Sequence, residues 1–276
     1  MNAFRFSIVL LLQIMLGGFA SAAITDFETW TPVEDPDHAG LSASVDPSSA
    51  TLSAGNLAVP AGTDIGFQSV NGSTPASSSQ GYYFSPLADF SLAIDYSWTF
   101  SNNPSGFLGL GFGIGEDSDG MNSAGVAMAT SSGTPFLTFG GAGRVNDSDR
   151  GFSLGNPLFN TSTLSGTLFV EYEATSGSVI VGAAPVTSAA APTLSDDFDG
   201  IQKEWAGGNL MTSFFIRSDE PTPGTSWSGG NADAVFSNFR VLSGNPVAIP
   251  EPTGLGLLAT LGIIATTTRR RNRDRR

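Results

Sequence analysis

Two acidic side chains, two positions apart, form the pair in this sequence best suited to catalysis. Glu171 and Glu173 fall in the run 168–174, where apolar and polar residues alternate as in a β-strand. Alternate residues of a strand face the same way, with Cα atoms about 6–7 Å apart, so the two carboxylates share a face. Paired carboxylates are what glycoside hydrolysis requires. The alternative, which we favour, is a solvent-facing sheet surface that keeps an acidic protein soluble.

Three acidic turns carry side-chain oxygens at a spacing that suits calcium. The predicted calcium ligands are Asp117, Asp119, Asp147, Asp149, Asp197 and Asp199. Oxygen ligands spaced by two around a turn fit a hard cation, and an exported protein meets calcium outside the cell. None of the turns completes an EF-hand loop, because the acid expected near the loop's end is missing. The alternative is that these residues only stabilise the turn conformations.

Two tryptophans are predicted to stack against sugar rings. Trp227 lies in the polar run 225–231, where burial is least expected, and Trp205 is the second candidate. An aromatic ring offers a large apolar face with a specific geometry, which suits a sugar ring. Anchoring of a loop is the alternative role for both. Trp98 falls inside a strand-like run and is expected in the core.

The residue counts exclude several kinds of active site. The chain has no cysteine and one histidine, His38. A cysteine nucleophile, a thiolate metal site and a Ser-His-Asp triad therefore lack their parts. The glycine-rich run 109–115 suggests a phosphate-binding loop, but no helix pattern follows it to supply an N-terminus. We interpret that run as a strand with small residues.

The elements that must position these side chains are short strands. Runs with alternating apolar residues, divided by Gly, Ser, Asn and Pro, occupy 81–84, 90–100, 107–114, 125–129, 135–139, 168–174, 179–181, 209–217 and 232–242. No run in the body keeps a helical period over the length of a helix. The pattern predicts an all-β fold, an antiparallel β-sandwich of eight or more strands over residues 23–248. Residues 31–40, 71–80 and 182–192 are expected as loops.

Two of these runs carry a resemblance to a known fold family. The hairpin 168–181, with Tyr172 before an acidic residue and a Ser-Gly turn, resembles a strand pair of concanavalin-like and laminin-G-like jelly rolls. The run 234–242 similarly resembles the closing strand of exported jelly-roll domains. The resemblance implies a jelly-roll topology for the sandwich and leaves the function open, because one fold hosts many functions.

The first 22 residues have the three parts of a secretory signal. Arg5 stands in a short basic head, an apolar run follows over 6–16, and small residues precede a cleavage site after Ala22. The sequence therefore predicts a signal helix over 1–22 and export of the body.

The last 28 residues combine a short motif, a span and a basic end. Pro250, Glu251 and Pro252 precede the uncharged run 253–268, and six arginines lie within 269–276. The uncharged run is just under the length that spans a bilayer, which is about 17–25 residues. A transmembrane helix is expected here, with the arginines on the cytoplasmic side by the positive-inside rule.

This tail, residues 249–276, resembles the PEP-CTERM sorting signal of Gram-negative bacteria, with Pro250, Glu251 and Pro252 matching the motif. The resemblance implies an exosortase-like membrane protease as a partner. It also implies a precursor held in the inner membrane, then delivery of the body to the cell envelope, the surface or an extracellular matrix. An ordinary C-terminal anchor that is never processed is the alternative.

The charge of the body narrows the choice of partner. Residues 24–249 hold five basic and 23 acidic residues, a net charge of −18. Such a surface repels polyanions, so nucleic acid is excluded, while neutral glycans and metal ions are favoured. We therefore expect a non-enzymatic structural or surface protein, with exopolysaccharide as a partner. The alternatives are a calcium-assisted, lectin-like carbohydrate-binding module and, third, a glycoside hydrolase that uses Glu171 and Glu173.

Overall fold

The computed structural model describes residues 23–34, 40–55, 59, 62–71, 80–100, 107–116, 120–131, 134–152, 156–159, 164–218 and 230–249. Several predicted features lie outside these residues: the signal segment 1–22, His38, Asp117, Asp119, Trp227 and the tail from Pro250 through Glu251 and Pro252 to the end. Among the residues described, no helix has the length and apolar character needed to cross a membrane.

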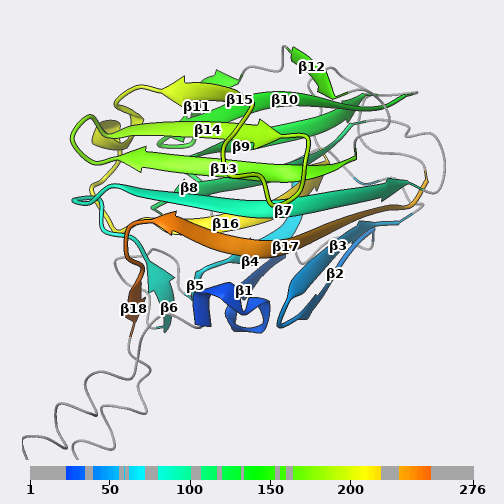
Figure 1. The fold of residues 1–276 in the computed structure, drawn as a ribbon, viewed down its shortest axis with the longest axis horizontal. Coiled ribbons are helices and arrows are strands. Elements are labelled where there is room, and N and C mark those ends of the chain that lie inside the picture. The colour runs from blue at the N-terminus through cyan, green and yellow to red at the C-terminus, as the bar shows by residue number, and fades with distance from the viewer. Residues whose placement is uncertain are drawn as a thin grey trace, which may run out of the picture.

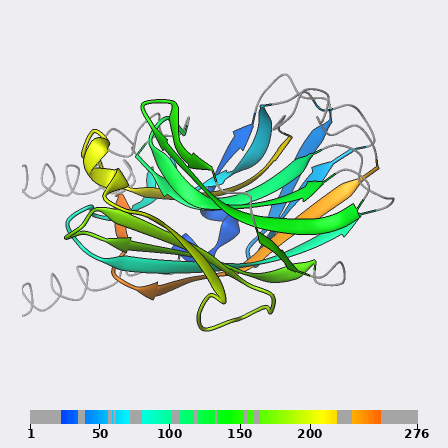
Figure 2. The same cartoon turned by 90° about the horizontal axis from the view of Figure 1, so that it is seen from above.

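The described residues form two antiparallel sheets that stack face to face (Figures 1 and 2). Sheet A runs, in spatial order, β1 (Thr31–Glu34), β4 (Thr63–Gln68), β16 (Met211–Ser218), β8 (Leu108–Gly115), β9 (Ser123–Ser131), β10 (Thr134–Val145) and β11 (Ser148–Phe152), and β12 (Asn156–Phe159) also pairs with β10. Sheet B runs β15 (Leu194–Phe198), β14 (Ser178–Ala184), β13 (Ser165–Glu173), β7 (Phe90–Phe100), β17 (Ala232–Ser243), β3 (Ser49–Ala54) and β2 (Leu41–Asp46). The predicted antiparallel β-sandwich is confirmed.

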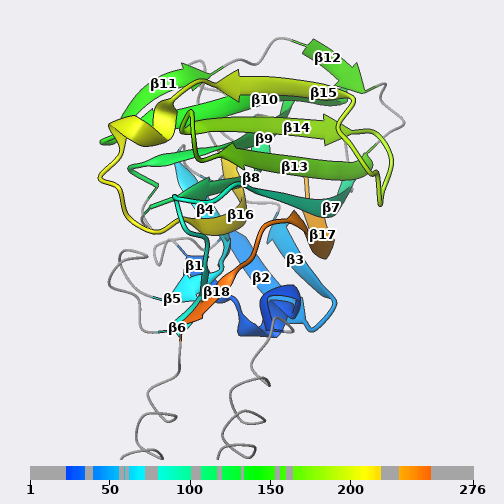
Figure 3. The ribbon, with the colours of Figure 1, turned by 60° about the vertical axis from the view of Figure 1, so that its left-hand side comes forward.

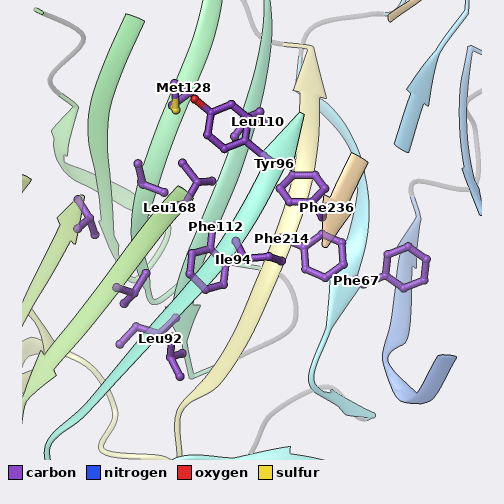
Figure 4. Packing of buried hydrophobic residues seen from close by; sticks show 14 of the residues in the cluster. Phe67, Leu92, Ile94, Tyr96, Leu110, Phe112, Met128, Leu168, Phe214 and Phe236 are labelled. Atoms are coloured by element: carbon purple, nitrogen blue, oxygen red, sulfur yellow. The ribbon is translucent and has the colours of Figure 1, made fainter. Parts of the chain in front are cut away.

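One large apolar core fills the space between the sheets (Figure 4). Its buried side chains come from both sheets and include Phe67, Leu92, Ile94, Tyr96, Leu110, Phe112, Met128, Leu168, Phe214 and Phe236. Full burial of one such side chain contributes about 1.5–3 kcal/mol. Strand periodicity brings them together, since every second residue of a strand points to the same side.

The strands predicted from alternation are all present, and the structure adds others. Two expected loops are corrected: residues 182–184 of the loop expected over 182–192 belong to β14, and part of the loop expected over residues 31–40 is a strand. β1 occupies the first four of them and pairs with β4, with Thr31 opposite Gln68. The hairpin of β2 and β3 was also not predicted, because serine and alanine dominate both strands and weaken the apolar signal.

A third, small sheet lies at one end of the sandwich. β18 (Val247–Ile249) pairs with β6 (Gln80–Tyr83), which pairs with β5 (Val70–Asn71). The short 3₁₀ helices η1 (Ala23–Thr25) and η2 (Phe27–Thr29) lie at the same end in both views (Figures 1 and 3). The two ends of the described chain therefore leave the sandwich on the same side.

The loop 185–193 folds back over the outward face of sheet B, in front of β13 and β7 (Figure 1). It covers a second, small apolar cluster of Ala93, Phe169 and Ala184, against which Ala189 of the loop packs. This contact explains why a segment of small uncharged residues holds a fixed place beside the sheet.

A buried carboxylate fastens the same loop. Asp95 accepts hydrogen bonds from Thr167 Oγ1 at 2.7 Å, from the backbone N–H of Ser188 at 3.0 Å and from Asn238 Nδ2 at 2.8 Å. Arg240 lies 3.4 Å away. Burial alone would raise the pKa of Asp95, but the hydrogen bonds from Asn238, Thr167 and Ser188 and the charge of Arg240 outweigh it and lower the pKa. Asp95 therefore stays ionised and joins loop and sheet.

Candidate functional site

The outward side of sheet A carries almost no side chains over three neighbouring strands. In β8, large residues that enter the core alternate with glycines that point outward. The strand register places small residues of β9 opposite these glycines. Small residues of β10 in turn lie opposite the small residues of β9. We call this surface the glycine face; its members are Gly109, Gly111, Gly113, Gly115, Gly125, Ala127, Ala129, Gly140 and Ala142.

The glycines of β8 and β9 are required by close approach at the middle of this face. A Cβ atom at Gly113 would lie 2.7 Å from Ala124 O and 2.9 Å from Gly125 Cα. Both neighbours are backbone atoms, which cannot turn aside as a side chain can. Gly125 and Ala127 are half-buried, whereas Gly111, Gly113 and Gly115 are buried, so only part of this face is open to solvent.

Phe215 of β16 is a large side chain beside this face, and Phe107 lies near Gly109 at its end. The strand register places it between Gly66 of β4 and Gly111 of β8. A Cβ atom at Gly111 would lie 2.7 Å from Phe215 Cε1, so the ring rests on that glycine. The side chain is half-buried, which leaves part of the ring open. The ring and the glycine face together form an aromatic platform on a sheet surface of small residues.

Gln68 supplies an unsatisfied polar atom on the same side of sheet A. It follows Gly66 by two positions in β4 and pairs with Ser213 of β16. The residue is 4% exposed, and its Oε1 has no hydrogen-bond partner. A buried acceptor left unpaired costs free energy, so such an atom needs an explanation.

An arginine stands at each end of the glycine face. Arg217 of β16 lies opposite Gly109 and is 3.6 Å from Asp64. Arg144 of β10 lies opposite Ser123 at the other end. Both guanidinium groups are about one-third exposed, at 34% and 30%. Both guanidinium groups are thus partly engaged by aspartates, Arg217 by Asp64 and Arg144 by Asp147 and Asp149.

The predicted calcium ligands of the turn between β10 and β11 are engaged by Arg144. Asp147 Oδ1 lies 2.6 Å from Arg144 Nη2, and Asp149 Oδ1 lies 3.6 Å from its Nε. Asn146 and Asp147 have φ angles of 49° and 64°, as a two-residue hairpin turn with right-handed strand twist requires. In this turn the two aspartates therefore form ion pairs with Arg144, and Asp147 also adopts the left-handed backbone conformation of the turn.

The second described pair of predicted ligands lies at the edge of sheet B. Asp199 accepts a hydrogen bond from Ser178 Oγ at 3.0 Å. The pKa of Asp197 is raised by burial first and then by the negative charges of Asp199, Glu173 and Asp196. In the part of the chain that the structure describes, no three His, Cys, Asp or Glu side chains gather as a metal site.

Glu171 and Glu173 lie on the outward side of β13, as the alternation predicted, and both are exposed. They belong to sheet B and so lie across the sandwich from the glycine face. Ser176 Oγ donates a hydrogen bond to Glu173 Oε2 at 3.1 Å. The structure therefore does not bring this pair together with Phe215.

Trp205 is 6% exposed, and its Nε1 donates a hydrogen bond to Arg144 O at 3.0 Å. This corrects the expectation of an exposed sugar platform, because a ring packed into the core has no free face. Trp205 anchors the loop after η3 (Ile201–Glu204). Trp98, expected in the core, is 2% exposed.

Glu116 has a role that the sequence did not suggest. It is buried at the end of β8, and its carboxylate accepts the backbone N–H groups of Ala206, Gly207 and Gly208 at 2.6–2.7 Å. Successive N–H groups that converge in this way form a binding site for a carboxylate. The small residues directly after Trp205 were the available signal.

Phe215, Gln68 and the glycine face were likewise not singled out from the sequence. The glycine repeat was noticed, but only as a strand with small residues. The missing information was the register, because it takes the pairing of β16 with β8 to place Phe215 on Gly111.

No family model and no curated protein matches the sequence. Among solved structures, an alginate lyase from Alteromonas sp. 272 has a TM-score of 0.46 and 10% identity, over 83% of this chain and 99% of that one. A prokaryotic β-1,3-1,4-glucanase (lichenase) derived from a mouse hindgut metagenome has a TM-score of 0.42 and 9% identity, over 77% and 92%. A lectin from Bauhinia forficata, in complex with GalNAc, has a TM-score of 0.39 and 9% identity, over 78% and 100%.

These similarities correct the expectation of a protein without enzymatic activity. Glycoside hydrolases and alginate lyases are among the similar structures, so a non-enzymatic role is not supported. With identities of 9–10% and TM-scores of 0.39–0.46 in the three named cases, the similarities assign no activity and no residue role to this chain.

Proposed function

We propose that this protein is an exported β-sandwich that binds a neutral polysaccharide on the glycine face. The observation that supports the proposal most is the half-buried ring of Phe215 resting on Gly111, next to the half-buried Ala127. Glycan sites combine apolar contact area with a few well-placed polar groups. Here the ring and the half-buried Gly109, Gly125 and Ala127 supply the area, and the partly exposed Arg144 at the end of the face supplies a polar group.

The charge of the molecule supports a neutral ligand. The body has a net charge of −18, and each arginine near the glycine face already lies close to an aspartate. An anionic polymer would meet long-range repulsion from such a surface. Hydroxyl groups of a neutral sugar would accept hydrogen bonds from the partly exposed guanidinium group of Arg144.

A binding panel tests the proposal. The full-length chain in a sugar-free detergent is applied to neutral and anionic polysaccharides, with calcium and again with a chelator, and released sugars are assayed in the same samples. We expect saturable binding to at least one neutral polysaccharide and none to the anionic ones. Absence of saturable binding across the panel would overturn the proposal. The chelator series decides whether calcium at Asp197 and Asp199 assists binding, and the sugar assay decides whether the glycan is cut.

The location of the protein is proposed from its two terminal segments. The motif Pro250-Glu251-Pro252 and the arginines after it support sorting by an exosortase-like protease to the envelope or matrix. Because β18 ends at Ile249, the motif begins directly after a paired strand. Mass spectrometry of the mature protein from its own envelope is expected to show a C-terminus near the motif. A mature chain that still ends in Arg276 would contradict processing.

A further inference from the structure

A polar pocket lies on sheet B, away from the glycine face. It has a volume of about 320 Å³ and is built where β2, β3 and the start of β17 meet. Gly40 and Gly55 close the open end of the β2–β3 hairpin, with Gly55 N–H donating to Gly40 O at 2.7 Å. The size is at the lower end of the range for small-ligand sites.

The side chains that line this pocket are brought together by the register of three strands. Ser42 of β2 lies opposite Ser53 of β3, and Ser53 lies opposite Asp233 of β17. Each of these three residues alternates with core residues such as Ala54 and Ala232, so their side chains share the outward face of sheet B. Asn231 completes the polar lining.

Asp233 is the charged group of the pocket. Its Oδ1 accepts a hydrogen bond from Ser53 Oγ at 2.5 Å. Among the described residues nothing else pairs with Asp233, and no basic side chain lines the pocket. Oδ2 is therefore left as a charged acceptor, and hydrogen bonds to charged groups are the stronger ones.

The chemistry of the lining selects one class of ligand. An anion is repelled by Asp233. A calcium ion takes six to eight oxygen ligands, commonly with several carboxylates, and this pocket supplies one. A ligand with adjacent hydroxyl groups matches the lining, because a hydroxyl both donates and accepts. Such a ligand would donate to Asp233 Oδ2 and bond to Ser42 and Asn231.

We propose that this pocket is a second saccharide site, which binds a neutral sugar unit through Asp233, Ser42 and Asn231. The site depends on its own residues and stands whether or not the glycine face binds glycan. Its position on the other sheet gives the molecule two separate glycan contacts if both proposals hold.

Calorimetry with the full-length chain in a sugar-free detergent tests this site. The probes are neutral tetrasaccharides of glucose, mannose, galactose and xylose. We expect at least one to bind, Asp233→Asn to weaken that binding by at least about tenfold, and Ser42→Ala to weaken it less. Ser44→Ala is the matched control, because Ser44 is exposed on the same face of β2 but lies outside the pocket. The tetrasaccharide affinity of this variant should equal that of wild type.

Two outcomes would overturn the pocket site. One is that no tetrasaccharide binds; the other is that binding survives both Asp233→Asn and Ser42→Ala. Binding that is lost in Phe215→Ala but kept in Asp233→Asn would assign the sugar to the glycine face instead. Thermal unfolding of each variant separates lost binding from lost folding, and exposed Ser42 keeps the test valid if Asp233→Asn unfolds.

Discussion

The ring of Phe215 rests on Gly111, at a distance where even one methyl group on the glycine would collide with it. A Cβ atom there would lie 2.7 Å from Phe215 Cε1 and 2.9 Å from Cε2. The contact joins β16 to β8, strands that lie about 100 positions apart in the sequence. The absence of a side chain at Gly111 therefore sets how the aromatic ring lies on the sheet.

Gly111→Ala is expected to lift the ring of Phe215 from the sheet and weaken glycan binding. The obstacle is the far end of a side chain that can rotate, so the fold should be kept. Gly208→Ala is the control, since a Cβ there meets nothing nearer than 3.9 Å and the residue lies outside the glycine face. Polysaccharide affinity of the two variants checks this. Equal affinity in both would show that the position of the ring does not matter.

Gly113→Ala is expected to lower the free energy of unfolding by about 1–3 kcal/mol. Its new methyl group would meet backbone atoms of Ala124 and Gly125 at 2.7–2.9 Å, and the strands β8 and β9 would have to separate. Chemical denaturation measures the difference against Gly109→Ala, where a Cβ would meet its nearest neighbours at 3.6 Å, which is ordinary contact. A Gly113→Ala protein as stable as that control would contradict the close packing of these two strands.

Glu116→Gln is expected to cost about 1–3 kcal/mol of stability, because it places an N–H₂ group against three backbone donors. Those donors belong to residues 206–208 and now point at the two carboxylate oxygens. Glu204→Gln is the control, because Glu204 forms an exposed ion pair with Arg150, and such pairs are worth about 0–1 kcal/mol. Similar losses in both variants would refute the buried role of Glu116.

Stability should depend on the ionisation of Asp95. Its pKa is lowered in the folded protein, so its contribution is complete above the unfolded value near 4 and is lost as the pH falls through the folded value. Wild type should therefore exceed Asp95→Asn in unfolding free energy at pH 7, and the difference should shrink below about pH 4. Denaturation curves at several pH values measure it. A difference that stays constant down to pH 2 would mean that the carboxylate contributes nothing through its charge.

The fold could be predicted because its central strands follow a simple rule. In β8 every second residue is large and apolar, and in β13 the acids alternate with buried residues, so both strands are visible without a structure. β2 and β3 lacked that contrast, since small residues occupy both faces. β1 is four residues long and holds a proline, which weakens any strand signal.

The candidate site could be predicted much less well, because it depends on pairing between distant segments. Alternation shows that Gly111 and Phe215 each point outward, but not that they lie side by side. For Trp205 the burial of the side chain itself was predicted wrongly. Trp205 was a candidate for sugar stacking, whereas its indole N–H donates to the backbone carbonyl of Arg144 and the ring is buried.

The central claim is that the ring of Phe215 on the glycine face holds a neutral glycan. The most direct measurement is the affinity of the full-length chain for the best neutral polysaccharide of the panel, compared between wild type, Phe215→Ala and Tyr83→Ala. Tyr83 is a half-buried aromatic residue of β6, in the small sheet and outside the glycine face. We predict that Phe215→Ala loses at least about tenfold in affinity, as for removal of an aromatic anchor, while Tyr83→Ala binds as wild type does. Wild-type affinity in Phe215→Ala would contradict the account.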